Sequence, residues 1–547
     1  MRIYSILCCF ILLFSNNTFG QKWDTIYGNP GISESFRDLK EFYDNGYLIS
    51  GGHKNPQGNW LIKTSINKNI LWEKIITWEN TTVYSGYMDQ DSNGNIYIAS
   101  TINSEINGFW PMAIKLDSCG EKLWCRVFQD YDNYNYGWFN DVLALDNGDM
   151  LAVGELDSEE EIEKIFLWYI DSDGDLKWRQ GYASQNNYPH IRETNCDGIR
   201  KYGSNYIIHG HCYYPYPSDT THFYQRPLFI MLDSLFNEQW IIPFGVSDSL
   251  IGAALESFQL NDSVYMGVGM LRLEGTTEHS LIMYFNEDGQ ELGYKEIPND
   301  SIGLNISQNY MNDIERINDS LFITSTTFAL NNEIAFWGEL IIDTGAIIYK
   351  QEFRPIQTHG WTSMVKTFDN KYIIGCNWDE GNGNDDIYLY KINENLEQDT
   401  IYPGTYTYDS LCPYQIQSGE IDISDCLIVT DVGEIPTPKE YYASIQTIPI
   451  KAYPNPVDGN KVTFEFENTE YLSPPLIPSR WSGTSSVGGT QPHLCIYNVY
   501  GKLVHEEMIY PYQGESVVDV GLWKKGMYFG VVYSGGKVAG RCKFVVQ

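Results

Sequence analysis

The sequence predicts an all-β protein, in which a β-propeller of about seven repeats is followed by a small C-terminal β-sandwich. Aromatic residues make up 15% of the chain and 48 glycines supply turns, a composition typical of proteins with many β-hairpins. A strand, a turn and an aromatic residue recur in order along residues 21–404. The final ~100 residues follow another pattern, in which apolar and polar residues alternate as in a two-layer sandwich.

The repeat has two parts. In the first, an apolar strand and a polar turn are followed by a tryptophan: Trp72, Trp124, Trp178 or Trp240. Degraded copies carry a tyrosine instead: Tyr294, Tyr349 and Tyr402. The second part is a turn before a short apolar strand, and its copies are residues 44–52, 92–100, 146–154, 202–210, 260–269, 317–325 and 368–376. These copies define seven units.

Units follow one another at intervals of about 48 to 62 residues, which suits four short strands each, or one propeller blade. A linear solenoid would need shorter rungs and capping repeats, and six or eight blades remain alternatives. Residues 21–31 carry a Trp-bearing last strand without its three partners, so we expect them to complete the seventh blade and close the ring. Each repeated Trp should pack between neighbouring blades. Over residues 21–404 the pattern resembles secreted bacterial β-propeller repeat proteins.

The N-terminus predicts export. Arg2, the apolar run of residues 3–14 and the small residues Thr18 and Gly20 have the order of a signal peptide covering residues 1–20. The net charge of −35 argues against nucleic acid as a partner, because a phosphate-binding surface needs clustered Lys and Arg. We therefore expect a secreted or cell-surface protein that reaches its location through the periplasm.

Nine cysteines follow the signal peptide, and export permits disulfides. Proximity along the chain predicts four pairs and leaves Cys376 over: Cys119–Cys125, Cys196–Cys212, Cys412–Cys426 and Cys495–Cys542. Metal binding by these cysteines is the weaker interpretation, because the mature chain has no C-x-x-C pair.

Two groups of residues are weak metal candidates. Asp171, Asp173 and Asp175 alternate around a turn, as calcium ligands do, but other units form the same turn without acids. His209 and His211 lie two apart on one strand and so share a face, and His222 follows in the next segment. No third ligand is fixed there. The sequence therefore assigns no catalytic, cofactor or metal site.

Two functions remain open for the propeller. The first is non-enzymatic binding of an extracellular ligand, a glycan or a host protein, by its loops and central funnel. The second is hydrolysis or lysis of a surface polysaccharide by carboxylates in the funnel, since 71 acids are available. The segment around Arg354 weakly resembles the Arg motif of sialidases, without their Asp boxes. Paired carboxylates in a deep cleft would favour the enzyme, whereas an aromatic or uncharged surface would favour binding.

The end of the chain carries an ordered series of short motifs. Residues 405–448 are polar and punctuated by prolines, and we interpret them as a connector. Residues 449–547 then contain Tyr453-Pro454-Asn455-Pro456, Asn498-x-x-Gly501, Trp523-x-x-Gly526-x-Tyr528 and Lys543-Phe544-Val545-Val546. At these residues the segment resembles the type A C-terminal sorting domain of the type IX secretion system of Bacteroidetes, from which the insertion at 473–492 departs.

That resemblance implies a route and a set of partners. The secretion machinery would recognise the domain in the periplasm and carry the protein across the outer membrane. In this family the domain is usually cleaved on arrival, and the cargo is released or attached to surface lipopolysaccharide.

Overall fold

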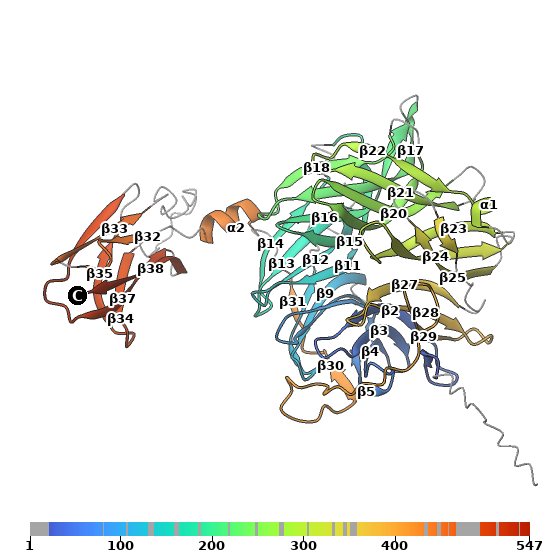
Figure 1. Ribbon diagram of the computed structural model, residues 1–547, viewed down its shortest axis with the longest axis horizontal. Helices are drawn as coiled ribbons and strands as arrows, with labels where there is room; N and C mark the ends of the chain where they lie inside the picture. The colour runs from blue at the N-terminus through green and yellow to red at the C-terminus, as the bar shows by residue number, and fades with distance from the viewer. Residues whose placement is uncertain are drawn as a thin grey trace, which may run out of the picture. The chain divides into compact units, whose positions relative to one another are not determined.

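The computed structural model is almost entirely β-structure and divides into two compact units (Figure 1). Residues 1–234 and 238–435 form the first unit, and residues 436–547 belong to the second. It describes residues 21–547 except 80, 105–107, 130–135, 158–163, 184–187, 217–218, 247–249, 273–277, 303–305, 331–333, 343–346, 351–357, 431–435, 446–449, 458, 467–492, 510–513 and 535–536. The expected signal peptide, Arg354 and the insertion at 473–492 lie outside this range. In the part of the chain that is described, no helix has the length and apolar character needed to cross a membrane.

The first unit contains seven sheets, each with at least four strands. Sheet 1 consists of β2 (Glu34–Glu41), β3 (Tyr47–Lys54), β4 (Gln57–Thr64) and β5 (Ile70–Thr77). Sheet 2 consists of β6 (Thr81–Val83), β7 (Tyr87–Gln90), β8 (Ile96–Ser104), β9 (Gly108–Leu116) and β10 (Lys122–Phe128). Sheet 3 consists of β11 (Tyr136–Ala144), β12 (Met150–Asp157), β13 (Lys164–Ile170) and β14 (Leu176–Gly181). Sheet 4 consists of β15 (Arg192–Tyr202), β16 (Asn205–Tyr216), β17 (Asp219–Leu232) and β18 (Glu238–Pro243).

The remaining three sheets continue this order. Sheet 5 consists of β19 (Gly252–Asn261), β20 (Val264–Arg272), β21 (Glu278–Asn286) and β22 (Glu291–Ile297), after which comes the short helix α1 (Asn299–Ile302). Sheet 6 consists of β23 (Ile306–Arg316), β24 (Phe322–Leu330), β25 (Ile334–Ile342) and β26 (Ile347–Lys350). Sheet 7 consists of β27 (Thr358–Lys366), β28 (Tyr372–Asp379), β29 (Asp385–Ile392) and β1 (Asp24–Tyr27).

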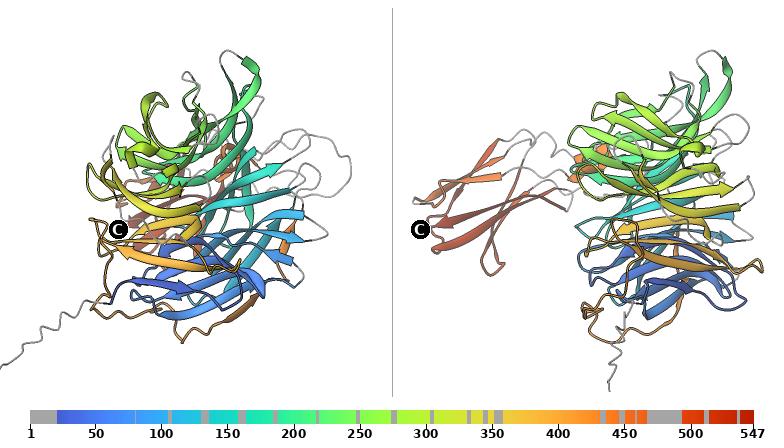
Figure 2. Two further views of the ribbon diagram at one scale, coloured as in Figure 1. Left: turned by 90° about the vertical axis from the view of Figure 1, so that its right-hand side faces the viewer. Right: turned by 45° about the vertical axis from the view of Figure 1, so that its right-hand side comes forward.

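The seven sheets form a closed, propeller-like ring. Their innermost strands contact one another in the order β2, β7, β11, β15, β19, β23 and β27, and β27 contacts β2 in turn. In Figures 1 and 2 the yellow strands β27 and β28 therefore lie beside the blue strands of sheet 1. The ring is fastened by β1, which pairs antiparallel with β29 at the outer edge of sheet 7. The predicted role of residues 21–31 in completing the last repeat is thus confirmed.

Tryptophans of the outer strands connect neighbouring sheets, as the repeat predicts. The Nε1 of Trp23, Trp124 and Trp240 donates to a turn carbonyl of the next sheet: Ile66 at 2.7 Å, Ser172 at 2.9 Å and Glu287 at 2.8 Å. The ring of Trp124 also packs against Gly174, whose φ is +85° and where a Cβ would lie 2.8 Å from the indole. A glycine is therefore required at this turn for both conformation and space.

Residues 402–429, which we call the strap, are part of the first unit and pack against the outside of its sheets. Residues 405–429 of the predicted connector at 405–448 thus belong to the first unit. Within the strap, β30 (Gly419–Asp422) pairs parallel with β5, and β31 (Leu427–Val429) pairs parallel with β10. Trp72 Nε1 donates to Asp409 Oδ1 over 3.3 Å. For Trp23, Trp124 and Trp240 the acceptor is a turn carbonyl of the next sheet, whereas for Trp72 the strap provides the acceptor.

Two disulfides fasten the strap, Cys119–Cys412 and Cys125–Cys426. The predicted pairs Cys119–Cys125 and Cys412–Cys426 are therefore wrong, because each cysteine bonds to the other segment. Cys196 and Cys212 are both free thiols, so the predicted pair Cys196–Cys212 is wrong as well.

The predicted pair Cys495–Cys542 is also wrong. Cys495 lies opposite Val531 and Val531 lies opposite Arg541, so the side chain of Cys542, the next residue, points to the other face of the sheet.

The second unit begins with helix α2 (Pro438–Ile445) and contains two sheets. One sheet has the order β32 (Ile450–Tyr453), β33 (Lys461–Phe466) and β36 (Glu515–Asp519). The other has the order β35 (Leu503–Met508), β34 (His493–Asn498), β37 (Gly526–Ser534) and β38 (Lys537–Val546). Side chains of both sheets, such as Phe464 and Ile496, share one apolar core.

The motif residues at the two ends of this unit contact each other. Asn455 Nδ2 donates to the Lys543 carbonyl and Asn455 Oδ1 accepts from the Val545 N–H, both over 3.1 Å. The side chain thus bonds to the last strand as a neighbouring strand would. Tyr453, Pro454 and Pro456 are exposed beside it.

The other motif residues have structural roles that can be identified. Asn498 Oδ1 accepts from the Tyr500 and Lys502 N–H groups, which fixes a turn where Gly501 has a φ of +73°. Trp523 lies 5.0 Å from Tyr528 between ring centroids, and the Tyr528 ring in turn stacks on Phe544. Gly526 begins β37, and Val546 is buried near the end of β38.

Candidate functional site

The two ends of the ring carry different connections. The turns that define the repeat, such as residues 42–46 and 65–69, lie where the innermost strands end. The other end, where the innermost strands begin, carries connections of varied length and sequence, and we call it the loop face. The repeated turns have the same structural role in every sheet. We therefore expect specific binding of a ligand at the loop face, where the connections differ from sheet to sheet.

A channel of about 400 Å³ runs along the ring axis. All seven innermost strands contribute to its wall. Its charged residues are mainly acidic: Asp38, Asp89, Asp141, Asp197, Glu256, Asp313 and Glu315, against Arg37, Lys40 and Arg200. The channel, which is the central funnel expected from the sequence, is therefore charged and rich in carboxylates.

Three of these aspartates connect neighbouring sheets in one way. Each follows a register shift in its innermost strand, accepts the N–H of the next residue, and accepts an N–H from the next sheet. The second bond joins Asp38 to Met88 at 2.8 Å, Asp141 to Ile199 at 3.0 Å and Asp313 to Met364 at 2.8 Å. A bulge redirects a side chain, which places these carboxylates between adjacent strands. In each aspartate, Oδ1 accepts from the next residue of its own strand and Oδ2 accepts from the next sheet, so both oxygens are engaged by backbone donors.

Arg200 is the main cation among these acids. Its Nη1 lies 2.7 Å from Asp141 Oδ2, and its Nη2 donates to Glu256 Oε2. The Asp141 and Glu256 side chains are only 8% and 7% exposed, so the guanidinium neutralises charge that water scarcely reaches.

Burial makes several channel acids weaker. It raises the pKa of Asp38, Asp89 and Glu315 above the usual range. Burial, together with the charges of Glu256 and Glu315, raises the pKa of Asp313 to about 8, although the Met364 N–H opposes the shift. Asp313 can therefore hold a proton at neutral pH, but its oxygens also accept hydrogen bonds from the backbone.

An aromatic cleft of about 470 Å³ opens on the loop face beside the channel. Its wall comes from sheets 1 to 3 and consists of Arg37, Tyr84, Ser85, Tyr87, Thr101, Phe109, Tyr136, Trp138, Phe139 and Asn140. The rings of Tyr136 and Trp138 stack with centroids 5.7 Å apart and planes 16° apart. Tyr84 and Phe109 are 37% and 40% exposed, so both rings are partly open to solvent.

Arg37 lies at the boundary between the aromatic cleft and the channel and lines both. Its guanidinium carbon is 5.3 Å from the Tyr87 ring centroid, within cation–π range. Its Nε donates to Ser85 Oγ over 3.3 Å. The cleft therefore combines flat apolar surfaces with a few polar groups, the usual make-up of a small-ligand site.

The Asp171 turn is filled by the chain's own cation. Asp171 Oδ1 accepts the N–H groups of Asp173 and Asp175, at 3.0 and 2.9 Å. Lys177 Nζ lies 2.6 Å from Asp171 Oδ2 and 3.4 Å from Asp175 Oδ2. The geometry agrees with an acidic hairpin turn in which a lysine pairs with two of the carboxylates.

The three histidines singled out in the sequence have separate environments. His209 is buried, with Nδ1 3.1 Å from Ser257 Oγ, and burial lowers its pKa. His211 Nδ1 lies 3.9 Å from Asp197 Oδ2, and His222 is exposed. Among the residues that the structure describes, they do not form a group whose ligand atoms could hold one ion.

The sequence analysis expected carboxylates in the funnel for its second function, but it identified neither the individual channel acids nor the aromatic cleft. A signal for the acids exists, since Asp38-Leu39, Asp141-Val142 and Asp313-Ile314 each repeat an acid followed by an apolar residue in the first strand of a unit. The cleft has no such signal, because its aromatic residues lie at the ends of different strands.

No protein-family model and no curated protein matches the sequence. A protein of unknown function from Dyadobacter fermentans matches the fold at 9% identity and a TM-score of 0.38, over 59% of this chain and 98% of its own. The α-L-arabinanase of Penicillium chrysogenum complexed with arabinobiose matches at 14% identity and 0.34, over 57% and 94%. Levansucrase of Bacillus subtilis in complex with oligosaccharides matches at 7% and 0.30, over 50% and 87%.

Proposed function

We propose that this is an exported protein that binds a glycan, without catalysis, in the aromatic cleft of a seven-bladed β-propeller. The observation that carries the proposal is the cleft itself: open aromatic side chains gathered at the variable end of the ring, beside Arg37. The C-terminal unit, on this proposal, is a β-sandwich sorting domain.

A glycan suits the chemistry of the cleft. Sugar rings present apolar C–H faces that pack on flat aromatic surfaces, such as the stacked pair Tyr136 and Trp138. Their hydroxyl groups need hydrogen-bonding partners, and Ser85, Thr101 and Asn140 lie in the same wall.

The position of the acids favours binding over hydrolysis. Among the described wall residues of the aromatic cleft none is an Asp or Glu. The carboxylates gather in the neighbouring channel, where Asp38, Asp141 and Asp313 hold the sheets together. A glycosidase needs two carboxyl groups on either side of the scissile bond. Hydrolysis or lysis by channel acids is the competing function, and the experiment below distinguishes it.

Replacing Trp138 with Ala should weaken glycan binding about tenfold, because it removes one ring of the stacked pair. The protein from Gln21 onward is screened on a glycan array, and the affinity for the best ligand is then measured by calorimetry. Tyr294→Ala is the control, since Tyr294 is an exposed aromatic residue on an outer strand.

Two results would contradict the proposal. Equal affinity of the parent and Trp138→Ala would exclude the cleft as the site. Release of new reducing or unsaturated ends from the bound glycan would show an enzyme instead of a binding protein.

The ordered motifs of residues 449–547 support a second part of the proposal, export by the type IX secretion machinery, with release or attachment to surface lipopolysaccharide. Deleting residues 449–547 should leave the protein in the periplasm, because the first unit carries its own core and disulfides but no sorting motif. Fractionation and surface protease treatment measure this. Surface delivery of the truncated protein at the normal level would refute the sorting assignment and leave the glycan proposal intact.

A further inference from the structure

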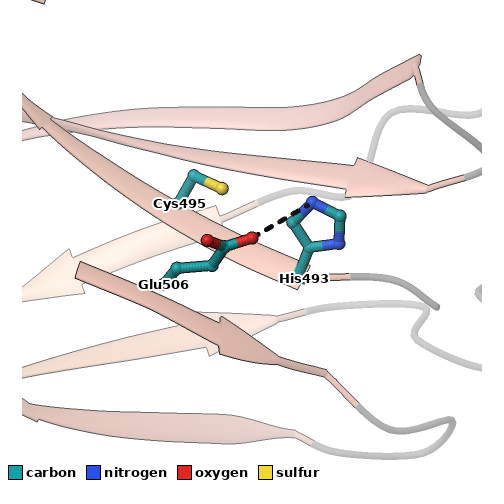
Figure 3. Close-up of side chains that lie close together, drawn as sticks. All are labelled: His493, Cys495 and Glu506. Atoms are coloured by element: carbon teal, nitrogen blue, oxygen red, sulfur yellow. Dashed lines mark ion pairs between the residues drawn. The ribbon is translucent and has the colours of Figure 1, made fainter. Parts of the chain in front are cut away.

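A histidine, a cysteine and a glutamate lie together in the second unit (Figure 3). His493 and Cys495 belong to β34, and Glu506 belongs to the neighbouring strand β35. One ligand atom from each residue lies within 4.8 Å of the other two. His493 Nε2 and Glu506 Oε1 are 3.7 Å apart.

The register of the hairpin places all three side chains on one face of the sheet. Cys495 lies directly opposite Glu506, and His493 lies two residues before Cys495 on the same strand. Leu494 and Ile496 alternate with them and point into the apolar core of the unit. The three residues therefore occupy the face of the sheet that points away from this core.

Neighbouring aromatic residues hold these side chains in place. Cys495 is only 4% exposed. The His493 ring stacks on Tyr533, with centroids 5.8 Å apart and planes 28° apart. The hydroxyls of Tyr497 and Tyr533 lie 3.4 Å from each other. Supporting contacts of this kind orient the ligands of metal sites.

We propose that His493, Cys495 and Glu506 bind a zinc ion. Imidazole nitrogen, thiolate sulfur and carboxylate oxygen are the three ligand types that zinc takes in proteins. Ligand atoms around tetrahedral zinc lie roughly 3.3 to 3.8 Å apart, given bonds of about 2.0 to 2.3 Å. The separations of up to 4.8 Å thus need only small side-chain movements to close around the ion.

The charges of the group also match zinc. The thiolate and the carboxylate together carry two negative charges, which a divalent cation neutralises. Binding releases the thiol proton of Cys495 to solvent, and a water molecule completes the coordination. A soft sulfur ligand disfavours calcium and magnesium, which prefer oxygen. The ion would connect β34 to β35 on their outer face and so stabilise the hairpin closed by the Asn498–Gly501 turn.

Cobalt titration of the protein from Gln21 onward tests the site, after removal of metal and without reductant, so that the disulfides stay intact. One equivalent of Co²⁺ should produce a thiolate-to-cobalt charge-transfer band in the near ultraviolet, and Zn²⁺ should abolish it. Cys495→Ser should remove the band, and His493→Gln should weaken Zn²⁺ binding at least tenfold.

Two variants in the same unit serve as controls and should leave the titration unchanged. Cys542→Ser removes a thiol from the other face of the same sheet, and His505→Gln removes a histidine that lies beside Glu507. Absence of the cobalt band in the folded parent would overturn the proposal, as would unchanged Zn²⁺ affinity of a folded Cys495→Ser protein. If a ligand variant fails to fold, the spectrum of the parent still decides the outcome. The site is independent of the glycan proposal.

Discussion

Removing one strap disulfide should lower the free energy of unfolding of the first unit by about 3 kcal/mol, whereas removing both should lower it by about 9 kcal/mol. The bridges Cys119–Cys412 and Cys125–Cys426 span 293 and 301 residues of sequence. Either bridge alone closes this long loop in the unfolded chain. The other then closes only a short ring of about 20 residues, whose closure entropy is smaller.

The loss from the double removal is comparable to the whole stability of an ordinary domain, so that protein should be largely unfolded. Cys119→Ser with Cys412→Ser removes one bridge, and adding Cys125→Ser with Cys426→Ser removes both. Urea titrations followed by tryptophan fluorescence measure the unfolding free energies.

Cys376→Ser is the control for replacing a buried sulfur without breaking a bridge. Peptide mapping without reductant should recover both cross-links in the parent. If the loss in the double variant were only the sum of the two single losses, the explanation by loop closure would be contradicted.

The parts of the fold that could be predicted from the sequence are those that short, repeated sequence patterns specify. Turn residues and a tryptophan at fixed spacing mark each repeat, because every sheet needs the same turn and the same contact with its neighbour. The closing strand could be predicted for the same reason, since Trp23 repeats the outer-strand pattern.

The strap could not be predicted in this way. Its strands β30 and β31 are short and pair parallel with outer strands, so they need no hairpin turn and show little alternation. Its cysteines were paired wrongly because a closed ring brings residues about 300 positions apart to the same place, and proximity along the chain does not measure that.

The candidate site was missed for a related reason. The aromatic cleft depends on Tyr84, Phe109 and Trp138, which meet only when sheets 2 and 3 are side by side. In the second unit, His493 and Cys495 show a spacing of two in the sequence, but Glu506 joins them only through the strand register. Pairing of strands, which single-sequence patterns specify poorly, thus decides both proposed sites.

Replacing Arg200 with Met should lower the free energy of unfolding of the first unit by about 3 kcal/mol at pH 7. The change preserves much of the side-chain volume but leaves Asp141 and Glu256 without their cation in a nearly buried position. Removing one partner of a buried ion pair is costly because the remaining charge has neither water nor a counter-charge.

The loss should grow with pH, and the sign follows from the pKa of Asp313. Its pKa is raised to about 8 in the folded protein, compared with about 4 when unfolded. Between these values the folded protein holds a proton that the unfolded chain has released, so stability falls as pH rises. The charge of Arg200 limits this shift, so without it the folded-state pKa rises further and the fall in stability continues to higher pH.

Urea titrations at pH 5 and pH 8 measure this dependence, and Glu256 supplies the control. Adding Glu256→Gln to Arg200→Met removes one of the two carboxylate charges that have lost their cation. The double variant should therefore regain much of the lost stability at pH 8. It should regain less at pH 5, where acids with raised pKa values can take up a proton in the single variant. The same loss at both pH values, without rescue by Glu256→Gln, would mean that Arg200 stabilises the ring by packing and not by neutralising the channel acids.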